Sequence, residues 1–172
     1  MLLLVSVLGE VHFDDVDSFK GKTAFHLGLV AEIMISDQFA FQPELIYSAQ
    51  GSDFEDSFDG RTFSGSVNAD FLNVPLMAKY FVTEGLSIEA GPQIGFMLSA
   101  KEEFEGIEVD IKDYLKGIDF GVNFGLGYKL ESGLNFSARY NLGLTDLNDN
   151  KDFLGDSSYK NSVIQVSIGY FF

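Results

Sequence analysis

The 172-residue chain contains no cysteine, no tryptophan and only 11 lysine and arginine residues against 26 acidic ones. The missing cysteine excludes a disulfide framework and any thiolate metal site. A formal net charge of −15 leaves no basic face that would neutralise phosphates, so nucleic acid is not an expected partner. No apolar run approaches the roughly 20 residues of a membrane-spanning helix. These absences exclude disulfide-stapled, nucleic-acid-binding and helical membrane proteins.

Glycine and phenylalanine are abundant, with 18 of each, and apolar residues recur with period two. In GIDFGVNFGLGYKL, residues 117–130, apolar side chains occupy the even positions and small or polar ones the odd positions. Successive side chains of a strand point to opposite faces, so such a pattern predicts a strand with one apolar face. Similar stretches cover the start of the chain, 23–35, 39–50, 71–82, 86–100, 134–144 and 162–172, which makes eight expected strands.

Short and long connections alternate between these strands. Short turns are expected at 36–38, 83–85 and 131–133, and long acidic loops near 10–22, 51–66, 100–116 and 146–160. In an up-and-down meander, alternate connections emerge at opposite ends. We therefore predict an all-β protein, a single domain over 1–172, folded as an eight-stranded antiparallel up-and-down barrel. Residues 1–22 are either the first strand, which we favour, or the remnant of a leader.

Alternation alone does not decide which face is inside. A soluble lipocalin-like carrier of apolar ligands has its apolar face inside, whereas a transmembrane barrel has it against lipid. Here the other face is rich in Gly, Ser, Asn and Gln, which suits the narrow interior of eight strands. We therefore predict a transmembrane barrel.

Two further sets of residues support this choice. Charges of both signs on the small-residue face would have to pair inside a narrow lumen. We expect a lumen charge network of Glu32, Glu44, Lys79, Glu89, Lys129 and Arg139. Aromatic residues near the short turns suit an interfacial girdle. We expect this girdle to contain Phe39, Phe41, Tyr80, Tyr128, Phe136, Tyr170 and Phe172.

Several motifs resemble the PorT-like outer-membrane β-barrel family, of OmpA/OmpX-like architecture and Bacteroidota type. They are FQPELIYSAQG, LNVPLMAKYF, EAGPQIGFMLSA, DFGVNFGLGYKL and the terminal IGYFF, and the resemblance runs from Lys22 to Phe172. It implies a Gram-negative outer-membrane protein with long loops extracellular and termini periplasmic. Its implied partners are outer-membrane lipid, the barrel-assembly machinery, for which Phe172 would be the assembly signal, and envelope or secretion proteins.

Residues with catalytic chemistry are scarce. His26, on the expected inner face, is the one candidate, and a hydrogen-bonded filler is the better interpretation. DLNDNKDFLGD loosely resembles a calcium loop but has Lys151 and Ser157 where such a loop needs Gly and Glu. We expect no enzyme activity, no cofactor and no metal site. Two functions remain: a structural or interaction barrel that displays its loops, or a transport role as a narrow pore or secretion component.

Overall fold

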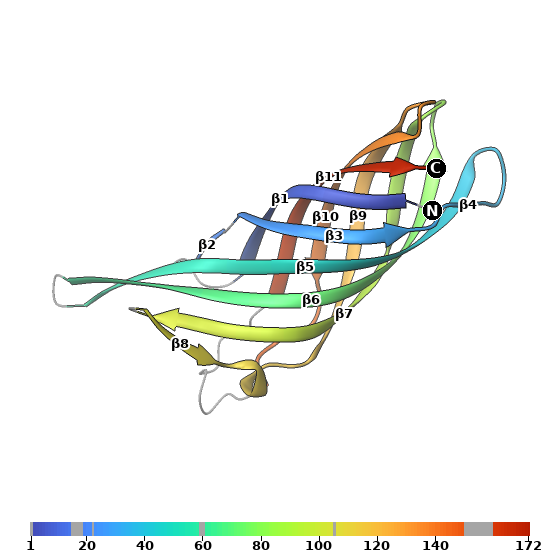
Figure 1. Cartoon of the computed structure of the whole chain (residues 1–172). Coiled ribbons are helices and arrows are strands. Elements are labelled where there is room, and N and C mark those ends of the chain that lie inside the picture. The colour runs from blue at the N-terminus through green and yellow to red at the C-terminus, as the bar shows by residue number, and fades with distance from the viewer. Residues whose placement is uncertain (1, 15–18, 22, 59–60, 105, 150–159) are drawn as a thin grey trace.

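The computed structural model describes residues 2–14, 19–21, 23–58, 61–104, 106–149 and 160–172, and eleven strands lie among them. The strands are β1 (Leu2–Asp14), β2 (Phe19–Gly21), β3 (Thr23–Val30), β4 (Ile33–Met34), β5 (Phe39–Phe58), β6 (Arg61–Phe81), β7 (Leu86–Phe104), β8 (Ile107–Asp110), β9 (Ile118–Lys129), β10 (Leu134–Gly143) and β11 (Lys160–Phe171). A single 3₁₀ turn, η1 (Lys112–Tyr114), follows β8. β2, β4 and β8 are short additions, and the other eight strands form the barrel (Figure 1).

The sheet closes on itself. Neighbouring strands run β5-β3-β1-β11-β10-β9-β7-β6, and β6 pairs with β5 to complete the ring, with every pairing antiparallel. The first and last strands meet at this seam, where Leu2 lies opposite Phe171, and the two chain ends lie side by side in Figure 1. Closure leaves no edge strand in the barrel wall. The expected all-β, eight-stranded, antiparallel up-and-down barrel is confirmed.

Side chains of the barrel wall alternate between a buried interior and an exposed exterior. On β9, the polar residues Asp119 and Asn123 are 4% and 1% exposed, whereas Phe124 and Leu126 are 53% and 55% exposed. The described parts of the other barrel strands follow the same trend: the exposed side chains are mostly aliphatic or aromatic, and the buried ones are mostly Gly, Ser, Asn, Gln and charged residues, with apolar exceptions such as Ile46, Phe71 and Met77. This orientation excludes the lipocalin-like arrangement, in which the apolar face is internal.

The three short turns lie at one end of the barrel, which we call the turn end; the opposite end is the loop end. Gly85 and Gly133 have φ of +95° and +90°, a region that only glycine occupies without strain. Their carbonyls accept hydrogen bonds of 2.8 Å from the backbone N–H groups of Lys129 and Phe171, so each turn is tied to the neighbouring strand.

The long connections are more regular than expected. β5 runs to Phe58 and β6 begins at Arg61, so most of the expected loop 51–66 is a hairpin that projects well beyond the barrel (Figure 1). Residues 100–116 likewise contain the end of β7, then β8 and the 3₁₀ turn η1. The sequence gives no apolar alternation here, because both faces of strands outside the barrel wall tolerate polar residues.

β1 covers the start of the chain and pairs with both β3 and β11. The pairing with β3 is irregular between Val7 and Gly9, where a bulge interrupts the register. Among the described residues, no helix is long and apolar enough to cross a membrane, a finding that concerns helices alone.

Candidate functional site

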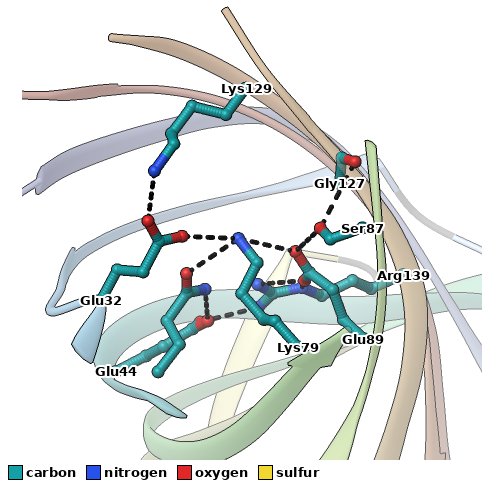
Figure 2. Close-up of polar contacts among 9 residues, drawn as sticks. Glu32, Glu44, Lys79, Ser87, Glu89, Gly127, Lys129 and Arg139 are labelled. Carbon is teal, nitrogen blue, oxygen red and sulfur yellow. Dashed lines mark hydrogen bonds and ion pairs between the residues drawn. The ribbon is translucent and has the colours of Figure 1, made fainter. Parts of the chain in front are cut away.

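The lumen near the turn end contains the six charged residues singled out in the sequence: Glu32, Glu44, Lys79, Glu89, Lys129 and Arg139, together the ionic cluster (Figure 2). Five of them stand on strands β5, β6, β7, β9 and β10. Glu32 lies in the two-residue break between β3 and β4. Its carboxylate, which is 6% exposed, lies in the lumen, on the inner face that its even position shares with His26 and Gly28.

Lys79 is at the centre of the cluster and is 1% exposed. Its Nζ lies 3.0 Å from Glu32 Oε2 and 3.1 Å from Glu89 Oε1, and it donates to Gln42 Oε1 at 3.1 Å. An ammonium has three protons to donate, and these three acceptors match that number. Lys129 pairs with the other oxygen of Glu32. Glu32 therefore joins the two lysines.

Arg139 forms the second half of the cluster. Its Nε and Nη2 lie 2.9 and 2.8 Å from Glu89 Oε2, and its Nη1 lies 2.7 Å from Glu44 Oε2. Gln42 donates to Glu44 Oε1 at 2.6 Å and Ser87 donates to Glu89 Oε1 at 3.2 Å. Three carboxylates thus face three cations, so the buried cluster has no net charge, as burial in a low dielectric requires.

Glycine on β9 makes room for these long side chains. A Cβ on Gly125 would lie 2.6 Å from Arg139 Cγ, and one on Gly127 would collide with the Glu89 carboxylate. Gly125 pairs in register with Glu89 on one side and Arg139 on the other. Gly125 and Gly127 of GVNFGLG therefore leave, on the inner face of β9, the space that the Arg139 and Glu89 side chains occupy.

Two aromatic rings cover the cluster on the turn side. Lys129 Nζ lies 4.9 Å from the Phe171 ring centre and 5.8 Å from that of Phe81, and Lys79 Nζ lies 5.6 Å from the Phe81 ring. These distances permit cation–π attraction. Lys129 and Phe81 also line a cavity of about 380 Å³ that the turns 36–38 and 83–85 border.

The middle of the lumen is polar but uncharged. Asn141 donates to Asn123 Oδ1 at 3.0 Å, and Asn123 donates to Gln93 Oε1 at 3.1 Å. His26 Nε2 lies 2.9 Å from Ser167 Oγ, and both residues are less than 5% exposed. A substrate reaches this pair only if the barrel opens, so the geometry favours the filler interpretation of His26.

At the loop end, an apolar cap replaces the charges. It comprises Ala69, Phe71, Met97, Ala100, Ile111 and Leu147, with Val67, Tyr114 and Leu115 packed against it. Ile111 and Leu147 come from the connections after β8 and β10, which are held together by a Leu115–Asn148 bridge and a Lys116 N–Leu147 O hydrogen bond of 2.9 Å. The cap is not predictable from the sequence because the segments that carry Ile111 and Leu147 have no apolar period.

Charge is arranged differently on the surface of the loop end. Lys101 on β7 lies 2.5 Å from Glu108 on β8, and both side chains are about half exposed. The hydrogen bond from Lys101 to the Glu108 carboxylate raises the pKa of the lysine above its usual range. Asp146 and Asn148 of the calcium-like stretch lie in the connection after β10, whereas Asn150 and Asp152 lie outside the described residues.

The seven aromatic residues expected in a girdle all lie on the outer face. Their exposed fractions run from 37% for Phe41 to 76% for Phe172. Phe39 and Tyr80 form a ring pair at 5.0 Å, and Tyr170 and Phe172 another at 5.6 Å. The remaining members are Tyr128 and Phe136. Phe172 follows the end of β11 at the barrel seam.

Comparison with known proteins agrees with this geometry. Two solved structures of Ail, the attachment invasion locus protein of Yersinia pestis, are similar to this chain. One, in complex with the heparin analogue sucrose octasulfate, has 17% identity and a TM-score of 0.55, and the other has 14% and 0.51. Each match covers 99% of this chain and 96% of Ail. Neisserial surface protein A matches with 9% identity, a TM-score of 0.47, and coverage of 98% of this chain and 92% of its own.

At these identities the likeness to Ail concerns the fold alone. A search of curated proteins gave no match. The sequence profile of the outer membrane protein beta-barrel domain, however, matches residues 7–149, most of the chain. Together with the closed barrel and its apolar exterior, this match assigns the chain to the outer-membrane β-barrel domain family and to the Gram-negative outer membrane.

Proposed function

We propose that this barrel is a non-enzymatic scaffold of the outer membrane whose lumen is plugged and whose loop end engages other molecules outside the cell. The observation that carries the proposal is the ionic cluster, in which Arg139 and Lys79 bridge three carboxylates from different parts of the barrel wall. Breaking one such buried pair costs about 3–5 kcal/mol, so a permanently open channel past the cluster is unfavourable.

The orientation follows from the lengths of the connections. Outer-membrane barrels have short periplasmic turns and longer extracellular loops. The turn end, which also carries both chain ends, therefore faces the periplasm, and the projecting β5–β6 hairpin faces outward. Lipid surrounds the aromatic residues, and the exposed Phe172 is presented to the barrel-assembly machinery during folding.

The chemistry of the loop end limits the class of partner. Ail is described in complex with a sulfated heparin analogue. In this chain the long connections are acidic, with Asp53, Glu55, Asp56 and Asp59 in one and a net charge of −15 overall. Like charges repel, so we propose neutral or basic partners, including envelope proteins, and not polyanions such as heparin or nucleic acid.

Single-channel recording in planar lipid bilayers tests the plugged lumen. We expect the refolded wild-type barrel to give no stable conductance steps. Lys101→Ala, which removes an exposed loop-end cation, is the matched control for Arg139→Ala, which removes a cation from the cluster. Stable steps in the wild type that grow in Arg139→Ala and not in Lys101→Ala would contradict the proposal and favour the alternative, a narrow pore with a transport role.

Epitope tags on intact cells test the orientation. A tag inserted after Glu108 at the loop end should bind antibody without permeabilisation, whereas one after Ser132 in a short turn should not. The reverse labelling would overturn the assignment of the loop end to the outside.

A further inference from the structure

The cavity that the turns 36–38 and 83–85 border, here called the turn cavity, lies beside the ionic cluster and has a volume of about 380 Å³. Lys129 belongs to both the cavity wall and the cluster. Small-molecule sites usually measure about 300–1,000 Å³, so the turn cavity has the size of a site for a molecule of one or two amino-acid residues.

Lys129 offers this cavity a cation with unused hydrogen-bond donors. Its side chain is 30% exposed, whereas the other five side chains of the ionic cluster are at most 6% exposed. An ammonium has three protons to donate. In the part of the chain that the structure describes, Lys129 Nζ donates to one carboxylate, that of Glu32 (Figure 2). Two donors therefore remain for an anion that enters the turn cavity.

Two carboxylates give the turn cavity the opposite charge as well. Asp37, in the turn between β4 and β5, and Glu84, in the turn between β6 and β7, both line it. Among the described residues, neither makes a hydrogen bond or an ion pair, and Lys129 pairs with neither of them. Opposite charges that line one cavity without contact leave a gap, which a molecule that carries both charges can fill.

Backbone hydrogen bonds fix the position of both carboxylate-bearing turns. Phe81 donates its backbone N–H to the carbonyl of Gln38, the residue after Asp37, at 2.8 Å. Lys129 donates its backbone N–H to the carbonyl of Gly85, the residue after Glu84, also at 2.8 Å. The turns are thus tied to the strands that carry the rest of the cavity wall, which lowers the entropy cost of ordering them around a ligand.

The rest of the wall is largely apolar. The Phe81 ring and the side chains of Met34 and Val82 line the turn cavity. Met34 is 51% exposed and Val82 is 49% exposed. An apolar group that occupies the cavity removes this surface from water, which is favourable.

We propose that the turn cavity binds a small zwitterion with an apolar body, of which an apolar dipeptide is the simplest example. The ligand carboxylate accepts hydrogen bonds from Lys129 Nζ, and the ligand ammonium donates to Asp37 and Glu84. The apolar side chains of the ligand pack on Phe81 and the apolar wall beside it. A dipeptide has few atoms and its charge partners are partly exposed, so we expect a dissociation constant on the order of 10⁻⁴ M.

The test measures the binding of leucyl-leucine to the full chain, refolded in detergent, by saturation-transfer NMR with empty micelles as the blank. Wild type should bind this dipeptide saturably. N-acetyl-leucyl-leucine lacks the ammonium and leucyl-leucinamide lacks the carboxylate, so each should bind at least about tenfold more weakly. Diffuse attraction to a chain of net charge −15 would instead favour the amide, which is a cation.

Variants assign the binding to the turn cavity. Asp37→Asn combined with Glu84→Gln keeps the shapes of both side chains, and the affinity for leucyl-leucine should fall at least about tenfold. Glu131→Gln, the same change in the turn 131–133, which does not line the cavity, is the matched control and should bind as wild type does. Lys129→Met should lower the affinity for leucyl-leucine to that for leucyl-leucinamide.

The proposal is overturned if wild type shows no saturable binding, if the amide binds as tightly as leucyl-leucine, or if the double variant binds as wild type does. O-phosphoethanolamine, the zwitterion of a phospholipid headgroup, lacks the apolar body, and tighter binding of this molecule than of leucyl-leucine would also overturn it. The double variant decides the matter if Lys129→Met does not fold, because no described hydrogen bond or ion pair depends on Asp37 or Glu84.

Discussion

The turn end and the loop end of the lumen are filled by opposite chemistry. The ionic cluster at the turn end consists of long charged side chains, most of them from regular strands, that pair both with neighbouring strands and across the lumen. The apolar cap at the loop end draws Ile111 and Leu147 from irregular connections and packs them on Phe71 and Met97. Both fill space, but only the first depends on exact pairing.

This difference separates two sources of stability in one barrel. Removing one partner of a buried ion pair lowers the free energy of unfolding by several kcal/mol, because the other charge is left buried and uncompensated. Apolar packing loses an amount that depends on how far the site collapses around the missing atoms. The turn end should therefore respond to substitution cooperatively, and the loop end locally.

Removal of Glu89 should have the largest effect. Glu89→Ala removes the carboxylate that both Arg139 and Lys79 contact. We therefore expect the free energy of unfolding to fall by about 3–5 kcal/mol. Urea unfolding of the refolded barrel in lipid vesicles measures it. Glu131→Ala, at an exposed turn position, should change stability by less than about 0.5 kcal/mol. Equal losses for the two variants would show that the cluster does not hold the turn end.

Truncation of the apolar cap should cost less. Leu147→Ala removes a side chain that is 3% exposed, and we expect a loss of about 2–4 kcal/mol, with faster proteolysis of the connection around η1. Leu144→Ala, three residues earlier and 55% exposed, serves as the control. A Leu147→Ala variant as protease-resistant as Leu144→Ala would mean that the cap does not fasten the loop end.

Filling the space beside the cluster should have an intermediate effect. Gly125→Ala places a methyl group 2.6 Å from Arg139 Cγ, and we expect overpacking to cost about 1–3 kcal/mol. Gly117→Ala, where nothing lies within 4 Å of the new Cβ, is a matched control. Denaturant midpoints that agree within error would show that the β9 glycines are not required as spacers.

The edge of the cluster should be the least sensitive part. Lys129 is 30% exposed, and Glu32 keeps Lys79 as a partner when Lys129 is lost. Lys129→Met should therefore cost about 1 kcal/mol. A double-mutant cycle should give a smaller coupling energy for Glu32 with Lys129 than for Glu89 with Arg139. The opposite order would contradict the gradient from the centre of the cluster to its edge.

The strands of the barrel wall were predictable because one face must be apolar and the other must fit a narrow lumen. That constraint gives Ile118–Lys129 its strict period, and it also assigned His26 and the six charged residues to the inner face. It ends where the strands leave the barrel wall. The projecting part of the β5–β6 hairpin, rich in Asp, Ser and Gly, was therefore expected to be a loop.

Partners within the site were harder to predict than the faces. Contact between Arg139 and Glu44 joins residues 95 positions apart, and it depends on strand tilt and stagger, which alternation does not encode. The same strand tilt and stagger place Phe81 and Phe171 over the lysines. They also place Gln42 beside Lys79 and Ser87 beside the Glu89 carboxylate.

The central claim, that apolar side chains face lipid while polar ones fill the lumen, is tested most directly by a cysteine scan of β9. The chain has no native cysteine, so each introduced residue from 118 to 129 can be spin-labelled singly in lipid vesicles. We predict that labels at even positions, including Phe124 and Leu126, collide with lipid-soluble oxygen, whereas labels at odd positions, including Asn123, are shielded. Oxygen collisions with the opposite parity, or with no alternation, would contradict the account.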